Sequence, residues 1–209
     1  MTYVEMVENL GFHDHLCMIY ENHEEQFGMV LPYVKSGLLR NEKCVYIADD
    51  NTVEKVVSEM KNADADLFGK SLEKENLSVL TKKETYVKDG YFAPEKMIAL
   101  LTENTDMALK SGFAGLRATG EMTWMFAGDP GSERMMEYEA MLNDFFPKHQ
   151  ASAVCQYNRD KFSNEQLAIV FQTHPKVIYR NEIIVNPLYL SMEEEEAIKE
   201  KMLAILNSK

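Results

Sequence analysis

Short, continuous apolar runs alternate along the chain with longer segments whose apolar residues recur every three or four positions. The first pattern predicts buried strands, and the second predicts amphipathic helices. Strands are expected at 15–20, 43–50, 76–81, 113–122 and 151–158, followed by a β-rich stretch at 176–185. Helices are expected at 24–39, 51–63, 94–110, 131–146 and 164–174, and a charged amphipathic helix ends the chain.

The order of these elements predicts the fold class. Strands without a polar face, each followed by a helix, are typical of a mostly parallel sheet that is covered on both faces. We therefore expect an α/β three-layer sandwich over residues 1–190, with residues 191–209 forming a C-terminal acidic helix. Ligands of such sheets bind outside the carboxyl ends of the strands, so those ends are the expected site.

Composition and net charge indicate which classes of binding partner are disfavoured. The 209 residues carry a net charge of −12 and no long Lys/Arg cluster, which disfavours nucleic acid and anionic membranes. No apolar run is long enough to span a bilayer, and the N-terminus lacks the features of a signal peptide. Cys17, Cys44 and Cys155 form no CxxC pair, which is typical of reduced thiols. The cytoplasm is the expected compartment.

A phosphate-binding loop is not expected. The sequence "GKS" at 69–71 resembles the end of such a motif, but Asp64 stands where the motif needs a glycine. This tripeptide is expected in a loop between a helix and the third strand. The turn after the first strand, "YENHEEQF" at 20–27, has no glycine, and its three glutamates would repel phosphate. Neither a nucleotide nor another cofactor is therefore expected.

Histidine and cysteine alternate at the first strand. His13, His15 and Cys17 would share one face if the strand began that early, and Cys155 or His174 could complete a zinc site with them. Such sites more often come from turns or helical pairs, so a ligand contact or a structural role is favoured over a metal. Cys17 as a nucleophile would need exposure and a converging base, which neighbours along a strand do not provide.

The fourth strand carries an unusual charged residue. Arg117 lies in an otherwise apolar segment, close to Glu121 and to the only tryptophan, Trp124. A buried arginine needs a partner, and Glu121, Glu137 and Glu139 are the candidates. Two interpretations stay open, namely a structural ion pair and a polar anchor in an apolar pocket walled by residues 122–126.

The fifth strand supplies Cys155 and Tyr157. In the strand order of nucleotide hydrolases, the fourth and fifth strands flank the first, which would bring these two residues near His15, Cys17 and Tyr20. The residues expected to contact a ligand are His15, Cys17, Tyr20, Arg117, Glu121, Trp124, Cys155 and Tyr157.

The ordered segments "HLCMIY", "ETYVKDGYFAPEKM", "LRATGEMTW" and "CQYNRDKF" resemble the MEDS family of methanogen/methylotroph, DcmR-type sensory domains. The resemblance extends from about residue 11 to residue 190. It implies a RecA/KaiC-like P-loop relative with a degenerate nucleotide loop. It also implies a sensor of small hydrocarbon derivatives, such as halogenated or methylated one-carbon compounds, with the family's His-x-Cys motif at His15 and Cys17 and completed by Tyr20.

Many relatives in that family carry a DNA-binding or kinase module, whereas only an acidic helix follows residue 190 here. The resemblance therefore implies output through a separate signalling protein, such as a kinase or a transcription regulator, or a helix that forms a homodimer. The leading hypothesis is a non-catalytic sensory domain that binds a small apolar molecule at the strand ends. A thiol- or metal-dependent enzyme and a protein–protein scaffold are the alternatives.

Overall fold

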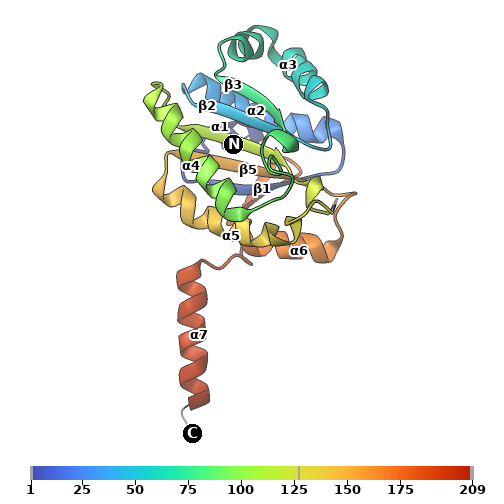
Figure 1. The fold of residues 1–209 in the computed structure, drawn as a ribbon. Helices are drawn as coiled ribbons and strands as arrows, with labels where there is room; N and C mark the ends of the chain where they lie inside the picture. The colour runs from blue at the N-terminus through green and yellow to red at the C-terminus, as the bar shows by residue number, and fades with distance from the viewer. Residues whose placement is uncertain (1, 127, 208–209) are drawn as a thin grey trace.

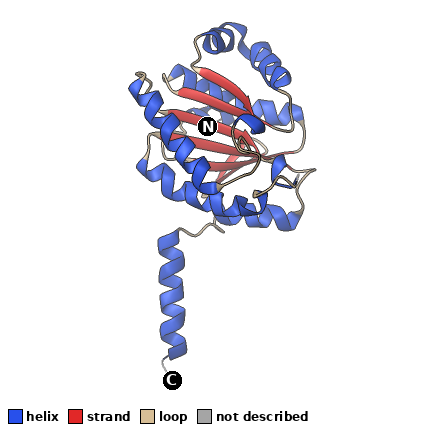
Figure 2. Cartoon of the chain, viewed as in Figure 1, coloured by secondary structure: helices blue, strands red, loops and turns tan. Residues whose placement is uncertain are grey.

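The computed structural model describes residues 2–126 and 128–207 and has a seven-stranded sheet at its centre (Figures 1 and 2). The strand order is β3-β2-β4-β5-β1-β6-β7, in which β7 pairs antiparallel with β6 and all other neighbours are parallel. The strands are β1 (His15–Tyr20), β2 (Lys43–Ala48), β3 (Leu77–Thr81), β4 (Leu116–Glu121), β5 (Ala151–Asn158), β6 (Lys176–Tyr179) and β7 (Glu182–Val185). The predicted α/β fold with a mostly parallel sheet is confirmed.

Two layers of helices enclose the sheet. The helices are α1 (Tyr3–Glu8), α2 (His23–Leu39), α3 (Val53–Glu73), α4 (Pro94–Lys110), α5 (Met135–Phe145), α6 (Asn164–Thr173) and α7 (Met192–Asn207), with short 3-10 turns at 82–84, 123–126, 132–134 and 146–148. Helices α1–α3 pack on one face and α4–α6 on the other. Alternation along β1 sends Cys17 into the α4–α6 layer and Met18 into the α1–α3 layer.

The turn after β1 contains no phosphate-binding loop. Helix α2 begins at His23, so only Glu21 and Asn22 connect it to the strand. The Asn22 side chain caps this helix by accepting a hydrogen bond from the Glu25 N–H at 2.9 Å. The helix N-terminus is therefore closed by the chain's own side chain, in agreement with the absence of glycines.

Helix α3 is longer than predicted. It continues to Glu73 and includes the "GKS" tripeptide at 69–71, so the prediction of a loop there was wrong. A kink at Asp64 (φ −160°, ψ 89°) divides the helix where the periodic pattern weakens. The Asp64 carboxylate accepts from the Leu67 N–H at 3.1 Å, which restarts the helix after the kink.

The last elements lie at one edge of the sheet. Strands β6 and β7 form a hairpin whose turn residues, Arg180 and Asn181, both adopt left-handed backbone conformations. Helix α7 then extends away from the rest of the chain (Figure 1), with Ile198, Met202 and Leu203 exposed. Within the described residues, no helix has the length and apolar character needed to cross a membrane.

Candidate functional site

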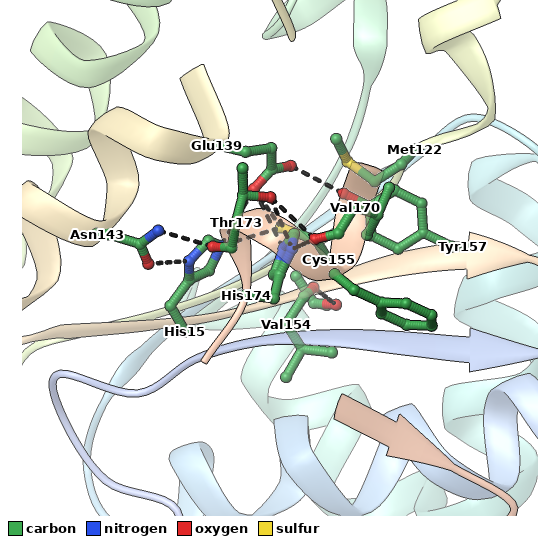
Figure 3. A network of polar contacts seen from close by, with 12 residues as sticks. His15, Met122, Glu139, Asn143, Val154, Cys155, Tyr157, Val170, Thr173 and His174 are labelled. Carbon is green, nitrogen blue, oxygen red and sulfur yellow. Dashed lines mark hydrogen bonds and ion pairs between the residues drawn. The ribbon is translucent and has the colours of Figure 1, made fainter. Parts of the chain in front are cut away.

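Four chemically active side chains meet in the α4–α6 layer, beside the centre of the sheet (Figure 3). His15 begins β1, Glu139 lies on α5, Cys155 lies in the middle of β5, and His174 follows α6. Their ligand atoms all lie within 4.8 Å of one another, and each residue is at most 5% exposed. We call this set the His–Glu–Cys cluster.

One carboxylate oxygen lies at the centre of the His–Glu–Cys cluster. Glu139 Oε2 lies 3.2 Å from His15 Nε2 and 3.2 Å from His174 Nε2. The Cys155 sulfur lies 3.7 Å from His15 Nε2 and 3.7 Å from Glu139 Oε2. The other carboxylate oxygen, Oε1, accepts a hydrogen bond from the Tyr157 hydroxyl at 3.0 Å. Oε1 therefore has a hydrogen-bond donor within the protein, whereas Oε2 faces the two imidazoles.

The outer nitrogens of the two imidazoles are held by acceptors. Asn143 donates its amide N–H to the Thr173 carbonyl at 2.7 Å, so its oxygen faces His15 Nδ1 at 2.9 Å. His174 Nδ1 lies 2.8 Å from the Val170 carbonyl. Because these oxygens can only accept, Nδ1 carries the proton on both rings. Each ring therefore directs Nε2 toward Glu139.

Burial and mutual charge set the protonation states in the His–Glu–Cys cluster. Burial is the larger cause that lowers the pKa of His15, and His174 lowers it further. Burial alone would raise the pKa of Glu139, but His174 and His15 outweigh it and hold that pKa well below its usual range. Burial, followed by the Glu139 charge, raises the pKa of the Cys155 thiol. The carboxylate therefore favours its ionised form, and the thiol favours its protonated form.

The structure brings together four of the residues predicted for the site. His15, Cys17, Cys155 and Tyr157 all face the α4–α6 layer, because β5 pairs directly with β1 in the register Cys17↔Cys155. The prediction that β4 and β5 flank β1 was right for β5 and wrong for β4. Strand β6, rather than β4, lies on the other side of β1. A role in ligand contact stays a prediction for these residues.

Other predicted members of the site lie elsewhere. Tyr20 faces the α1–α3 layer, with its hydroxyl 3.5 Å from Asp50 Oδ2. His13 precedes the strand in a left-handed conformation (φ 74°), and its Nδ1 lies 2.6 Å from the Phe146 carbonyl. The expected alternation from His13 to Cys17 therefore fails, because the strand begins at His15.

Arg117 lies far from any strand-end site. It is the second residue of β4, and its guanidinium forms a buried, two-point ion pair with Glu42 at 2.6 and 3.2 Å. None of the glutamates expected as partners is used. Gly37 lies inside α2, where a Cβ atom would overlap Arg117 Cδ, so the arginine requires a glycine at this position. Arg117 is thus a structural ion pair, the first of its two interpretations.

Glu121 closes the carboxyl end of β4 on the α1–α3 side of the sheet. Its Oε1 accepts from the side chains of Tyr46, Asn51 and Gln26 at 2.7, 2.8 and 3.1 Å. Its Oε2 accepts from the backbone N–H groups of Asp49 and Asn51, both at 2.8 Å. This strand end is therefore occupied by a buried carboxylate whose two oxygens both accept hydrogen bonds from neighbouring groups.

Trp124 belongs to the core rather than to a pocket wall. Its ring stacks on Tyr86 at 4.7 Å between centroids and contacts Phe92 at 5.0 Å. It is fully buried, and its Nε1–H has no acceptor among the described residues. The expected pocket at residues 122–126 is therefore replaced by aromatic packing around Trp124.

An apolar groove of about 490 Å³ opens instead at the carboxyl ends of β1 and β6. Strands and helix α6 supply its apolar walls, and the segment after β7 closes one side. The lining residues are Ile19, Arg159, Asn164, Leu167, Phe171, Val177, Tyr179, Ile184, Asn186, Pro187 and Leu188. Asn186 joins the groove to the His–Glu–Cys cluster, since its amide donates to the His174 carbonyl at 2.8 Å.

From the sequence, Glu139 was predicted only as a partner of Arg117, and neither Asn143 nor the groove was predicted. For Glu139 and Asn143, however, the sequence contained a usable signal. Glu139 and Asn143 are four residues apart on α5, on the same side as the buried Leu142, so both polar side chains had to face the sheet. The groove had no comparable signal, because its residues come from elements whose adjacency depends on the strand order.

The fold and these two features define an α/β domain with a mostly parallel sheet, a buried His–Glu–Cys cluster and an apolar groove at the strand ends. The family described as MEthanogen/methylotroph, DcmR Sensory domain (MEDS) matches residues 14–175, and the chain belongs to this family. This confirms the resemblance seen in the sequence, and with it a domain of the sensory class.

A curated relative supports the same assignment. The chain is 21% identical over 174 residues to the transcriptional repressor DcmR of Methylorubrum extorquens (strain DSM 6343 / CIP 106787 / DM4). The match covers 79% of this chain and 60% of the repressor, so the chain spans only part of that relative's length.

Solved structures resemble the fold. The flagellar accessory protein FlaH of Methanocaldococcus jannaschii superimposes with a TM-score of 0.56 at 8% identity, over 86% of this chain and 80% of FlaH. The KaiC-like protein PH0186 of Pyrococcus horikoshii OT3 gives 0.52 at 10% identity, over 79% of this chain and 70% of that protein. At these identities the likeness establishes the fold alone.

Proposed function

We propose that the chain is a non-catalytic sensory domain that binds an apolar hydrocarbon derivative in the groove between β1, β6 and α6. The observation that carries this proposal is the groove itself, an apolar concavity at strand ends with a few polar groups at its rim. Membership of a sensory family supports a binding role rather than a catalytic one.

The size of the groove favours a ligand of several carbons. A volume of 490 Å³ is many times the roughly 30 Å³ that one liquid water molecule occupies. A one-carbon compound would leave most of this space to water and would bury little apolar surface. A longer chain could contact Ile19, Leu167 and Val177 while its polar end reaches the rim near Tyr179.

The thiols argue against the enzyme alternative. Burial raises the pKa of Cys17 above that of an ordinary thiol, and burial also raises that of Cys155. Nucleophilic cysteines instead need a lowered pKa and access to substrate. The turn after β1 likewise disfavours a residual nucleotide hydrolase, because its glutamates would repel phosphate and Asn22 caps α2.

The segment that links the groove to α7 could transmit the effect of ligand binding. Pro187 and Leu188 line it and lie just before α7, whose Ile198, Met202 and Leu203 are exposed. A ligand changes output only by binding one conformation of this segment more tightly than another. We propose that occupancy of the groove repositions residues 186–191, and that α7 presents the result to a separate regulatory protein.

The test is a binding series with linear 1-alkanols of increasing length, with dichloromethane as the one-carbon probe, measured by isothermal titration calorimetry. Burial of each CH2 is worth about 0.8 kcal/mol, so affinity should rise about fourfold per carbon until the groove is filled. Dichloromethane should bind most weakly.

A matched pair of variants locates the binding site. Ile184 lines the groove and is 44% exposed, whereas its neighbour Val185 is 76% exposed and does not line it. Ile184→Glu should weaken alkanol binding about tenfold or more, and Val185→Glu should leave it unchanged. Affinity that is independent of chain length, or equal losses in both variants, would contradict the proposal.

A further inference from the structure

We propose that the His–Glu–Cys cluster is a closed binding site for a divalent transition-metal ion, with Zn²⁺ as the preferred ion. The ligand atoms would be His15 Nε2, His174 Nε2, Cys155 Sγ and Glu139 Oε2. This inference is independent of the apolar groove, because it rests on a different set of side chains.

The hydrogen bonds of the two imidazoles leave their Nε2 atoms available to coordinate a metal ion. Asn143 and the Val170 carbonyl hold the proton of each ring on Nδ1, so in the neutral rings each Nε2 presents a lone pair. Both lone pairs face Glu139 Oε2 at 3.2 Å, and His174 Nε2 has no hydrogen-bond partner among the described residues. Buried lone pairs that converge on a carboxylate require a positive charge between them.

The spacing matches a tetrahedral centre. With Zn–N and Zn–O bonds of about 2.0–2.1 Å and a Zn–S bond of about 2.3 Å, neighbouring ligand atoms lie about 3.3–3.6 Å apart. Both Nε2 atoms lie 3.2 Å from Glu139 Oε2, and Cys155 Sγ lies 3.7 Å from His15 Nε2 and 3.7 Å from Glu139 Oε2. All four ligand atoms lie within 4.8 Å of one another, so contraction of the cluster around the ion would complete the geometry.

The charges also match. One thiolate and one carboxylate neutralise a divalent ion, and two neutral imidazoles add none, so the loaded site carries no net charge inside a fully buried layer. A mixed nitrogen, sulfur and oxygen set suits zinc better than magnesium or calcium.

The surrounding contacts resemble the outer shell of a metal site. Ligating histidines usually donate their second nitrogen to a carbonyl or carboxylate, as both rings do here. Glu139 is oriented in the same way by the Tyr157 hydroxyl. Four protein ligands and full burial describe a structural or sensory metal rather than a catalytic one, which keeps a position open for water.

The first experiment measures metal uptake. Protein made without a histidine tag, kept reduced and stripped with a chelator, is titrated with Zn²⁺ and Co²⁺. We expect one bound equivalent by elemental analysis, and a thiolate-to-cobalt charge-transfer band with the visible spectrum of a tetrahedral ion. No uptake of either ion would overturn the proposal and would leave a cluster balanced by protons alone.

Cysteine variants identify the sulfur ligand. Cys155→Ser should abolish the charge-transfer band, whereas Cys17→Ser, on the adjacent strand, and Cys44→Ser, in the other helical layer, should retain it. A band that survives in Cys155→Ser would overturn the assignment.

A measurement on the unmodified protein covers the case in which Cys155→Ser does not fold. X-ray absorption of the zinc-loaded chain should show one sulfur at about 2.3 Å and three nitrogen or oxygen atoms at about 2.0–2.1 Å. A shell without sulfur, or with more than one sulfur, would contradict the proposed ligand set.

Discussion

His15 and His174 lie side by side with their ring centroids 4.4 Å apart, and both direct Nε2 at the same carboxylate oxygen of Glu139. The sheet creates this relationship. Because β6 pairs parallel with β1 in the register Leu16↔Lys176, the two residues before β6 must lie beside the start of β1. A histidine at position 174 is thereby brought to His15 from a distant part of the sequence.

Glu139→Gln should destabilise the chain and remove its metal affinity. The amide retains the shape and can still accept from Tyr157, but it removes the charge that faces two imidazoles. We expect a loss of about 1–3 kcal/mol in the free energy of unfolding, measured by urea denaturation at constant metal concentration. The control is Glu137→Gln on the same helix, whose exposed ion pair with Arg134 should contribute less than about 1 kcal/mol. Equal losses in both variants would show that Glu139 has no special role.

Arg117→Met should be strongly destabilising because it leaves Glu42 buried without its partner. Removing one member of a buried pair typically costs about 3–5 kcal/mol. The double variant Arg117→Met/Glu42→Met should recover part of that loss, because it buries no unpaired charge. Chemical denaturation of the two single variants and the double variant measures the coupling. A double variant as unstable as the sum of the single variants would contradict the importance of the ion pair.

Two glycines of α2 should respond oppositely to the same substitution. Gly37→Ala should destabilise, since the new Cβ would lie 2.4 Å from Arg117 Cδ and 2.9 Å from Cys44 Sγ. Gly28→Ala meets no atom within 4 Å and should stabilise by about 0.5–1 kcal/mol through helix propensity. Thermal unfolding of both variants under one set of conditions provides the test. A stabilised Gly37→Ala would show that the buried arginine can move aside.

Acid should weaken the kink of α3. Hydrogen bonds from Lys35 and from the Leu67 N–H hold the pKa of Asp64 below its usual range. Since the folded pKa is the lower one, the stabilising contribution is fully present above the unfolded value of about 3.9 and is lost as pH falls through the folded pKa. Asp64→Asn should therefore reduce the pH dependence of stability below about pH 4.

Urea midpoints measured across that range check this prediction, with Asp66→Asn in the same helix as the control for the loss of one carboxylate. A pH profile of Asp64→Asn that follows the wild-type profile would assign the acid sensitivity to another group.

The first and fifth strands have the bounds that their apolar runs predicted, 15–20 and 151–158, and α4 begins and ends as expected at Pro94 and Lys110. These elements were readable because local periodicity and a helix-starting proline act over a few residues. Helix α3 was not, since Asp64 interrupts the pattern while Lys35, from another helix, stabilises the interruption.

The sequence by itself determined the alternation of strands and helices, the absence of a phosphate-binding loop and the presence of His15, Cys17, Cys155 and Tyr157 on buried strands. Only the tertiary structure decided their partners. Strand β1 begins two residues after His13, which leaves His13 outside the strand, and the strand order places β6 rather than β4 beside β1. Side-chain contacts between distant segments depend on strand order and register, which no local pattern encodes. For this reason Glu139 and His174 join the cluster, while Arg117 pairs with Glu42.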